Sequence, residues 1–181
     1  MEAKSVSASK TIITELMIPS YANFSGKVHG GTLLSLMDKV AYVCAAKHSG
    51  CYCVTVAVEG VEFKQPVEVG ELVSLSASVN YVGKSSMVIG IRVESLRPKT
   101  GEIKHTNTCY FSMVAKDDEG KPTQVPALIL ETEEDVRRFA EAKKLKSMRA
   151  KISEMLHTEY ENYSLEQLKK ELENERCVIS V

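Results

Sequence analysis

The segment that most constrains this chain runs from Gly30 or Gly31 to about His48 and forms a helix that is apolar around most of its circumference. Its apolar residues do not fall on one stripe: they are Leu33, Leu34, Leu36, Met37, Val40, Ala41, Val43, Cys44 and Ala45. An ordinary surface helix has a single apolar face, so this pattern predicts a helix that is buried on nearly all sides. Gly50 is suited to end it, because glycine readily adopts the left-handed conformation that often follows a helix.

Strand-like segments flank this helix. Thr11–Met17 precedes it, and four segments follow it, over residues 53–63, 71–82, 87–96 and 103–115. Apolar and polar residues alternate along them, most clearly over 71–82. Consecutive strands with short turns favour an antiparallel meander. A small sheet can bury a helix on nearly all sides only by curling around it, so the pattern predicts an α+β hotdog fold.

The composition changes beyond Pro126. Residues 131–160 are rich in Glu, Lys and Arg, and their apolar residues recur at helical spacing, which predicts a helix that packs on something. Thr132 with Asp135 resembles a capping box, and Ser164 is suited to cap a second, short helix. We therefore predict a hotdog domain over residues 9–126 and a C-terminal helical extension over residues 127–181.

The composition also excludes several classes of protein. The net charge is −1, which argues against a nucleic-acid surface built on bulk positive charge. The N-terminus has no apolar signal core, and no apolar run approaches the length of a membrane span. Five cysteines, an odd number, suggest reduced thiols, and Cys51 and Cys53 lack the spacing of a zinc pair. We expect a cytoplasmic protein with no metal, nucleic-acid partner or membrane partner.

The residues most able to do chemistry lie between Asn23 and Asp38. A polar loop ends in Gly30 and Gly31 and opens directly into the apolar helix. Backbone N–H groups at a helix start carry the positive end of the helix dipole and can polarise a carbonyl. Asp38 should lie on an apolar face and act as base or nucleophile, because its helical neighbours are Leu34, Ala41 and Ala45. This arrangement predicts acyl transfer, in the form of hydrolysis.

The combined motif resembles a known family. Asn23-x-x-Gly26-x-x-x-Gly30-Gly31 is followed by Asp38, then by the strand 54–63 and by Pro66-Val67-x-Val69-Gly70. This pattern is similar to the acyl-CoA thioester hydrolases of the hotdog superfamily, in the single-domain bacterial form that is related to the two-domain brain acyl-CoA hydrolase. The similarity covers roughly residues 9–150.

The resemblance implies hydrolysis of acyl-CoA to free fatty acid and coenzyme A, with no cofactor apart from the coenzyme A of the substrate. It implies that Asn23 and Asp38 act together in one site and come from different subunits. The substrate carbonyl would be held by the N–H groups of Gly30 and Gly31. It also implies a homo-oligomer, at least a dimer and by analogy a hexamer made of three dimers.

Gly83-Lys84-Ser85-Ser86 imitates the end of a phosphate-binding P-loop. However, Ser78 stands where the first glycine of such a loop is needed, and a strand follows instead of a helix. We therefore reject nucleotide hydrolysis and interpret Lys84, Ser85 and Ser86 as candidate contacts for the coenzyme phosphates.

Two other functions stay open. One is a hydroxyacyl dehydratase on the same fold, for which the sequence offers His29 before the glycines but no Pro-rich loop with a histidine. The other is a non-catalytic acyl-CoA-binding protein. A thioester hydrolysis assay separates these functions from the thioesterase.

Overall fold

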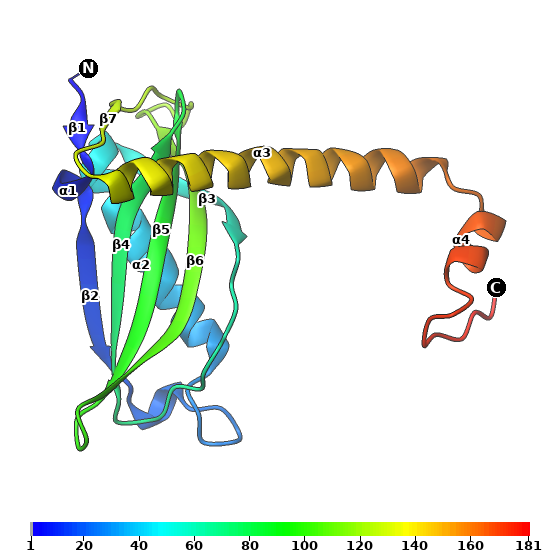
Figure 1. Cartoon of the computed structure of the whole chain (residues 1–181), viewed down its shortest axis with the longest axis horizontal. Coiled ribbons are helices and arrows are strands. Elements are labelled where there is room, and N and C mark those ends of the chain that lie inside the picture. The colour runs from blue at the N-terminus through cyan, green and yellow to red at the C-terminus, as the bar shows by residue number, and fades with distance from the viewer. Residues whose placement is uncertain (1) are drawn as a thin grey trace. The chain divides into compact units, whose positions relative to one another are not determined.

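The computed structural model describes residues 2–181, apart from the side chains of residues 157–162 (Figure 1). It contains a 3-10 turn over Pro19–Tyr21. The other elements, in order, are β1 (Lys4–Ser5), α1 (Val6–Ser9), β2 (Thr11–Leu16), α2 (Gly30–Ser49), β3 (Tyr52–Glu59), β4 (Leu72–Val82), β5 (Ser86–Arg97), β6 (Glu102–Lys116), β7 (Leu128–Ile129), α3 (Glu133–Asn162) and α4 (Leu165–Glu171).

The chain forms two compact units, residues 1–142 and residues 143–181. In the first unit β1 pairs with β7, so two segments outside the predicted limits of 9–126 come together there. The division of the chain into a domain over 9–126 and an extension over 127–181 stays a prediction.

The main sheet confirms the hotdog fold. Its five antiparallel strands lie in the order β2-β4-β5-β6-β3 and pack against the long helix α2. The predicted meander is right for β4, β5 and β6 but wrong for β3. That strand pairs with β6 at the far edge, because β2 occupies the place beside β4. The chain between β3 and β4, which contains Gly60 and Pro66, crosses from the β3 edge of the sheet to β4, the strand next to the opposite edge.

One side of α2 forms the core with the inner face of the sheet, which lies in front of the helix in Figure 1. Met37, Val40 and Cys44 are fully buried there with strand residues such as Leu75 and Phe111. Gly50 ends the helix in the left-handed conformation, with φ +70°.

The other side of α2 is exposed, so the prediction of burial on nearly all sides is wrong for a single chain. Tyr42 is 39% and Val43 38% exposed. Beside them, β3 forms an edge of the sheet and carries the exposed apolar residues Tyr52, Val56 and Val58. The reason is geometric: the sheet covers one side of α2 and does not close around the other. A single chain therefore leaves an apolar surface and an unpaired strand edge together.

The predicted helix starts after residue 126 are confirmed. Thr132 and Asp135 form a reciprocal capping box, in which each side chain accepts from the other's backbone N–H at 3.1 Å. Ser164 and Gln167 form a second one at α4. Within the first unit, Phe139 of α3 packs on Tyr81 of β4, with ring centroids 5.0 Å apart.

Buried His48, near the end of α2, makes stability depend on pH. Its Nε2 lies 3.0 Å from the carbonyl oxygen of Pro126, and burial lowers the pKa of its imidazole below the usual 6.5. Near pH 6.5 the imidazole is therefore protonated in the unfolded chain but still neutral in the folded chain. The contribution of His48 to stability is fully present above that pH and is lost as the pH falls toward the lower pKa of the folded state.

We expect the free energy of unfolding to fall as the pH is lowered below about 6.5, because the unfolded imidazole gains its proton first. Urea denaturation at a series of pH values measures the slope. The variant His48→Gln should be less stable at pH 7 but should show a flatter pH dependence. An unchanged slope in that variant would assign the pH dependence to other groups.

Candidate active site

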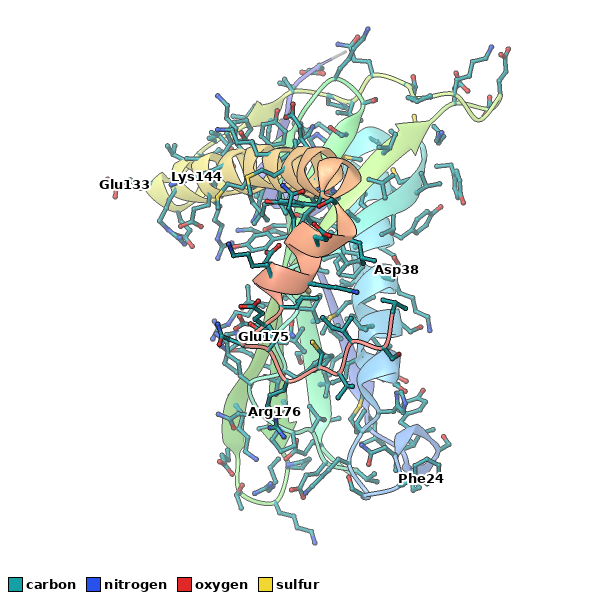
Figure 2. All side chains as sticks on the ribbon, turned by 90° about the vertical axis from the view of Figure 1, so that its right-hand side faces the viewer. Phe24, Asp38, Glu133, Lys144, Glu175 and Arg176 are labelled. Atoms are coloured by element: carbon teal, nitrogen blue, oxygen red, sulfur yellow. The ribbon has the colours of Figure 1, made fainter. Side chains whose placement is uncertain are left out.

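The carboxylate of Asp38 lies on the exposed side of α2 and is held by the neighbouring strand. Its Oδ1 accepts a hydrogen bond from Oγ1 of Thr55 on β3, at 2.6 Å. Asp38 is labelled in Figure 2. The expectation that Asp38 is buried on an apolar face is wrong for a single chain. It lies on the side of the helix that turns away from the sheet, although its helical neighbours Ala41 and Ala45 are buried.

A shallow groove follows this side of α2. One part, of about 600 Å³, is lined by Asp38, Tyr42 and Thr55. A second part, of about 470 Å³, is lined by His29, Gly31 and the first turns of the helix. Lys39 lines both parts, so they adjoin. The groove thus runs from the N-terminus of α2 past the carboxylate.

At the N-terminus of α2 the two glycines are not equivalent. His29 is the N-cap, and its Nδ1 accepts a hydrogen bond from the backbone N–H of Gly31 at 2.9 Å. The N–H of Gly30 donates to none of the described residues. A Cβ at Gly30 would lie 3.3 Å from the ring of Phe63, so the site has little room for a side chain. Gly30 therefore keeps a free donor at the helix start, and His29 occupies the donor of Gly31.

Asn23 lies in the loop before the helix and uses half of its amide to shape that loop. Its Oδ1 accepts from the backbone N–H of Ser25 at 2.9 Å, from the hydroxyl of Ser25 at 2.7 Å and from the N–H of Lys27 at 3.2 Å. Its Nδ2 donates to no residue within the described part of the chain, so it is available to a ligand. The adjacent Phe24 is fully exposed, at the end of the molecule where α2 begins (Figure 2).

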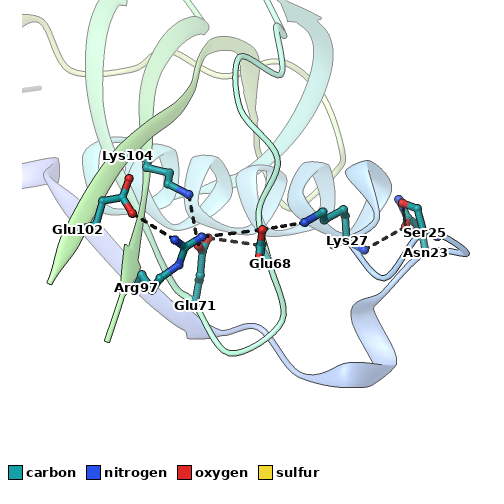
Figure 3. Close-up of polar contacts among 8 residues, drawn as sticks. All are labelled: Asn23, Ser25, Lys27, Glu68, Glu71, Arg97, Glu102 and Lys104. Carbon is teal, nitrogen blue, oxygen red and sulfur yellow. Dashed lines mark hydrogen bonds and ion pairs between the residues drawn. The ribbon is translucent and has the colours of Figure 1, made fainter. Parts of the chain in front are cut away.

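An ion-pair network ties this loop to the body of the first unit (Figure 3). Lys27 pairs with Glu68 at 2.7 Å, and its hydrogen bond holds the pKa of that carboxyl below its usual range. Arg97 contacts Glu68 at 3.8 Å and the buried Glu71 at 3.2 Å, and Lys104 contacts Glu71 at 3.7 Å. A loop anchored in this way presents Asn23 in a defined place before any ligand arrives.

The structure does not bring the helix start and Asp38 of one chain together. Gly31 and Asp38 are seven residues apart on the same helix, which is roughly 10 Å along its axis. A hydrogen-bond donor must lie within about 3 Å of a carbonyl oxygen, so one thioester cannot meet both groups of the same chain at its reacting carbon.

Lys84 and Ser85 lie in the tight turn between β4 and β5, and Ser86 is the first residue of β5. The N–H of Gly83 donates to the carbonyl of Ser86 at 2.7 Å, and the Lys84 side chain is exposed. Ser86 lies opposite Val114, which lies opposite Val54, the residue before Thr55. The turn is thus two strand spacings, about 10 Å, from β3, whose Thr55 donates to Asp38 of α2.

Thr55 is the site residue that the sequence interpretation missed. It belongs to the strand 54–63 of the family motif, where it is a hydroxyl residue within a run of Val and Ala. A single hydroxyl residue among apolar ones was the signal in the sequence that could have identified Thr55 as a site residue. Only the pairing of β3 beside α2 shows that its hydroxyl reaches the carboxylate of Asp38.

Comparisons with known proteins show the family to which the chain belongs. A family model described as the thioesterase superfamily matches residues 25–102. Protein VdlD of Helicobacter pylori is 48% identical over 142 residues, which are 78% of this chain and 81% of that protein. The structure of an apo-hexameric acyl-CoA thioesterase is 35% identical, with a TM-score of 0.82, over 84% of this chain and 98% of that chain.

A third similar protein is an acyl-CoA hydrolase from Staphylococcus aureus, whose structure holds butyryl coenzyme A and coenzyme A. It is 28% identical, with a TM-score of 0.78, over 89% of this chain and 99% of that chain. Three further structures of that hydrolase carry alanine in place of an asparagine, an aspartate and a threonine, one in each. Their spacing along that chain is the spacing of Asn23, Asp38 and Thr55 in this one.

Proposed function

We propose that this chain, which belongs to the acyl-CoA thioester hydrolases of the hotdog thioesterase superfamily, hydrolyses acyl-CoA thioesters to a free acid and coenzyme A. The observation that carries the proposal is the groove along α2, which holds a hydrogen-bonded carboxylate and begins at the helix N-terminus, next to the free N–H donor of Gly30. The coenzyme complexes of the Staphylococcus aureus hydrolase support the substrate class.

The direct test is release of coenzyme A thiol from a series of acyl-CoA substrates of increasing chain length. Thiol release with turnover at one or more lengths is expected. Saturable binding of acyl-CoA without thiol release would favour the binding protein instead. Hydration of an enoyl-CoA without thiol release would favour the dehydratase.

In this mechanism the carbonyl oxygen of the thioester accepts a hydrogen bond from the N–H of Gly30, and Asn23 donates through Nδ2 to the carbonyl or to the attacking water. Gly31 would contribute its own N–H once His29 turns away. The carboxylate of Asp38 either removes a proton from water or attacks the carbonyl carbon itself. The bond to sulfur then breaks, and the coenzyme leaves as a thiolate, which needs no strong general acid. If Asp38 is the nucleophile, a water then hydrolyses the acyl anhydride on its carboxylate and releases the free acid.

We assign the helix start with Asn23 to one subunit and the carboxylate of Asp38 to another in each site. The separation of roughly 10 Å within one helix prevents a single chain from using both at one carbonyl. The exposed Tyr42, Tyr52 and Val56 offer the apolar surface for a second copy, and a two-fold axis there would form two sites. The similar acyl-CoA thioesterase that is hexameric supports the assembly of three such dimers into a hexamer.

We expect at least a dimer, and a hexamer as the full assembly. Light scattering coupled to size exclusion gives the mass, and activity measured across a dilution series shows which species works. A monomer that retains full specific activity at low concentration would contradict the shared site.

Thr55 acts as a positioning residue for Asp38. The variant Thr55→Val keeps the volume and removes the hydroxyl that donates to Oδ1 at 2.6 Å. We expect kcat to fall about tenfold with KM little changed, because a general base loses efficiency when its orientation is lost. Thr55→Ser keeps the hydroxyl and should recover most of the rate, which a purely steric role of the threonine would not predict.

The coenzyme phosphates are assigned to Lys84 with the hydroxyls of Ser85 and Ser86, because the lysine is exposed at a tight turn near the groove.

We place the activity in the cytoplasm, with no metal and no cofactor. No helix among the described residues is long and apolar enough to cross a membrane.

A further inference from the structure

The C-terminal half of α3 carries a segment that the proposed site does not use, over residues 143–156. Five basic residues and no acidic one lie between residues 143 and 151: Lys143, Lys144, Lys146, Arg149 and Lys151. The next acidic residue is Glu154. The protein as a whole has a net charge of −1, so this segment is a strong local exception.

The same segment presents an apolar stripe. Four large apolar side chains are about half exposed: Met148 at 49%, Ile152 at 51%, Met155 at 55% and Leu156 at 52%. At 3.6 residues per turn, these four and Leu145 fall within an arc of about 100° on the helix. An uncovered apolar stripe on a charged helix indicates a contact with a partner.

Charge borders the stripe on both sides. Lys144 and Lys151 flank one side of it and Arg149 the other, whereas Lys143 points away from it. Lys144 and Lys151 form no ion pair with any side chain that the structure describes, and Lys144 is labelled on α3 in Figure 2. Long basic side chains beside an apolar stripe can keep their ammonium groups at a polar surface while the stripe is buried.

We propose that residues 143–156 dock on an anionic lipid surface, with the apolar stripe in the headgroup region and the flanking lysines on lipid phosphates. Such binding requires an amphipathic helix with a basic polar face and no spanning helix. This proposal replaces the expectation, drawn from the sequence, that the protein has no membrane partner.

A second copy of the helix fits this surface less well. Pairing two copies would bring their own basic flanks together, and like charges at close range repel. The apolar stripe also spans 12 residues, from Leu145 to Leu156, fewer than the three heptads that a sustained coiled coil needs. An anionic bilayer offers both the opposite charge and a place for the apolar side chains.

The test is co-sedimentation of the full-length protein with vesicles of phosphatidylglycerol and phosphatidylcholine at low salt, with vesicles of phosphatidylcholine alone as the neutral probe. We expect binding to the anionic vesicles only, weakened by added salt. The double variant Lys144→Gln with Lys151→Gln should lower the partition coefficient about 25-fold, because each basic residue near such a surface contributes about fivefold.

The matched control removes two charges elsewhere. Lys143→Gln with Lys99→Gln leaves the flanks of the stripe intact, since Lys143 points away and Lys99 lies in the β5–β6 turn, and this control should bind almost as the unchanged protein does. Equal losses in the two double variants, or no binding to anionic vesicles, would overturn the proposal.

The contribution of the apolar stripe is tested separately with the double variant Met148→Ser and Ile152→Ser. Weaker vesicle binding at an unchanged oligomeric mass supports docking on lipid. If this variant instead changes the oligomeric mass and leaves vesicle binding unaltered, the stripe is a subunit contact and the proposal fails. Neither assay measures hydrolysis, so the outcome is independent of the proposed function.

Discussion

Asp38→Asn should leave the fold and the assembly unchanged and lower kcat by about 100-fold or more. The substitution keeps the size of the side chain and its ability to accept from Thr55, but it removes the negative charge that activates water or attacks the carbonyl carbon. Stability should change little, because the carboxylate lies on the exposed side of α2. The measurement is thiol release under substrate saturation, with circular dichroism and light scattering on the same sample.

The control for this variant is Asp118→Asn, an equal loss of charge in the exposed turn after β6. It should retain normal turnover. If Asp38→Asn keeps more than about a tenth of the normal kcat while the control is unaffected, the carboxylate is neither base nor nucleophile, since loss of such a group typically costs about 100-fold or more.

Asn23→Ala is expected to have the second large effect, a strong loss of turnover. Two losses combine in this variant: the Nδ2 donor disappears, and the loop loses three hydrogen bonds that Oδ1 accepts. The variant Asn23→Asp separates them, because its carboxylate can still accept those three bonds but cannot donate from the position of Nδ2. Low kcat in both variants would assign the effect to the lost donor, whereas near-normal kcat in Asn23→Asp would assign it to the shape of the loop.

Mixing the Asn23→Ala and Asp38→Asn proteins tests whether one site uses two chains. In a mixed dimer, one of the two sites receives a normal Asn23 and a normal Asp38, and the other receives both substitutions. Random exchange makes about half of the dimers mixed, so activity should recover to about a quarter of normal. Distinct affinity tags on the two proteins verify the exchange, and mixed dimers that stay inactive would place both residues of a site in one chain.

The sequence by itself determined the fold class and the site motif. The helix 30–48 with its glycine stop, and the alternating segments 71–82, 87–96 and 103–115, are local patterns that depend on residue spacing alone. The capping boxes at residues 132–135 and 164–167 are equally local, because their partners lie three residues apart. The resemblance through Asn23, the glycine pair and Asp38 also required only spacing along the chain.

The order of the strands was decided by the tertiary structure. Periodicity shows that residues 52–59 form a strand but not which neighbour it takes, and competition with β2 for the edge of β4 sends it to β6. The hydroxyl of Thr55 meets Asp38 only because of that long-range pairing.

The exposure of the site was also a tertiary outcome. The sequence shows an apolar helix but not how much of it five strands can enclose, and the uncovered side carries Asp38, Tyr42 and Val43. Likewise, spacing along the chain placed the glycines and Asp38 in one motif, although the rise of the helix holds them roughly 10 Å apart. Local pattern specifies which residues share an element, whereas the distances between functional groups follow from how the elements pack.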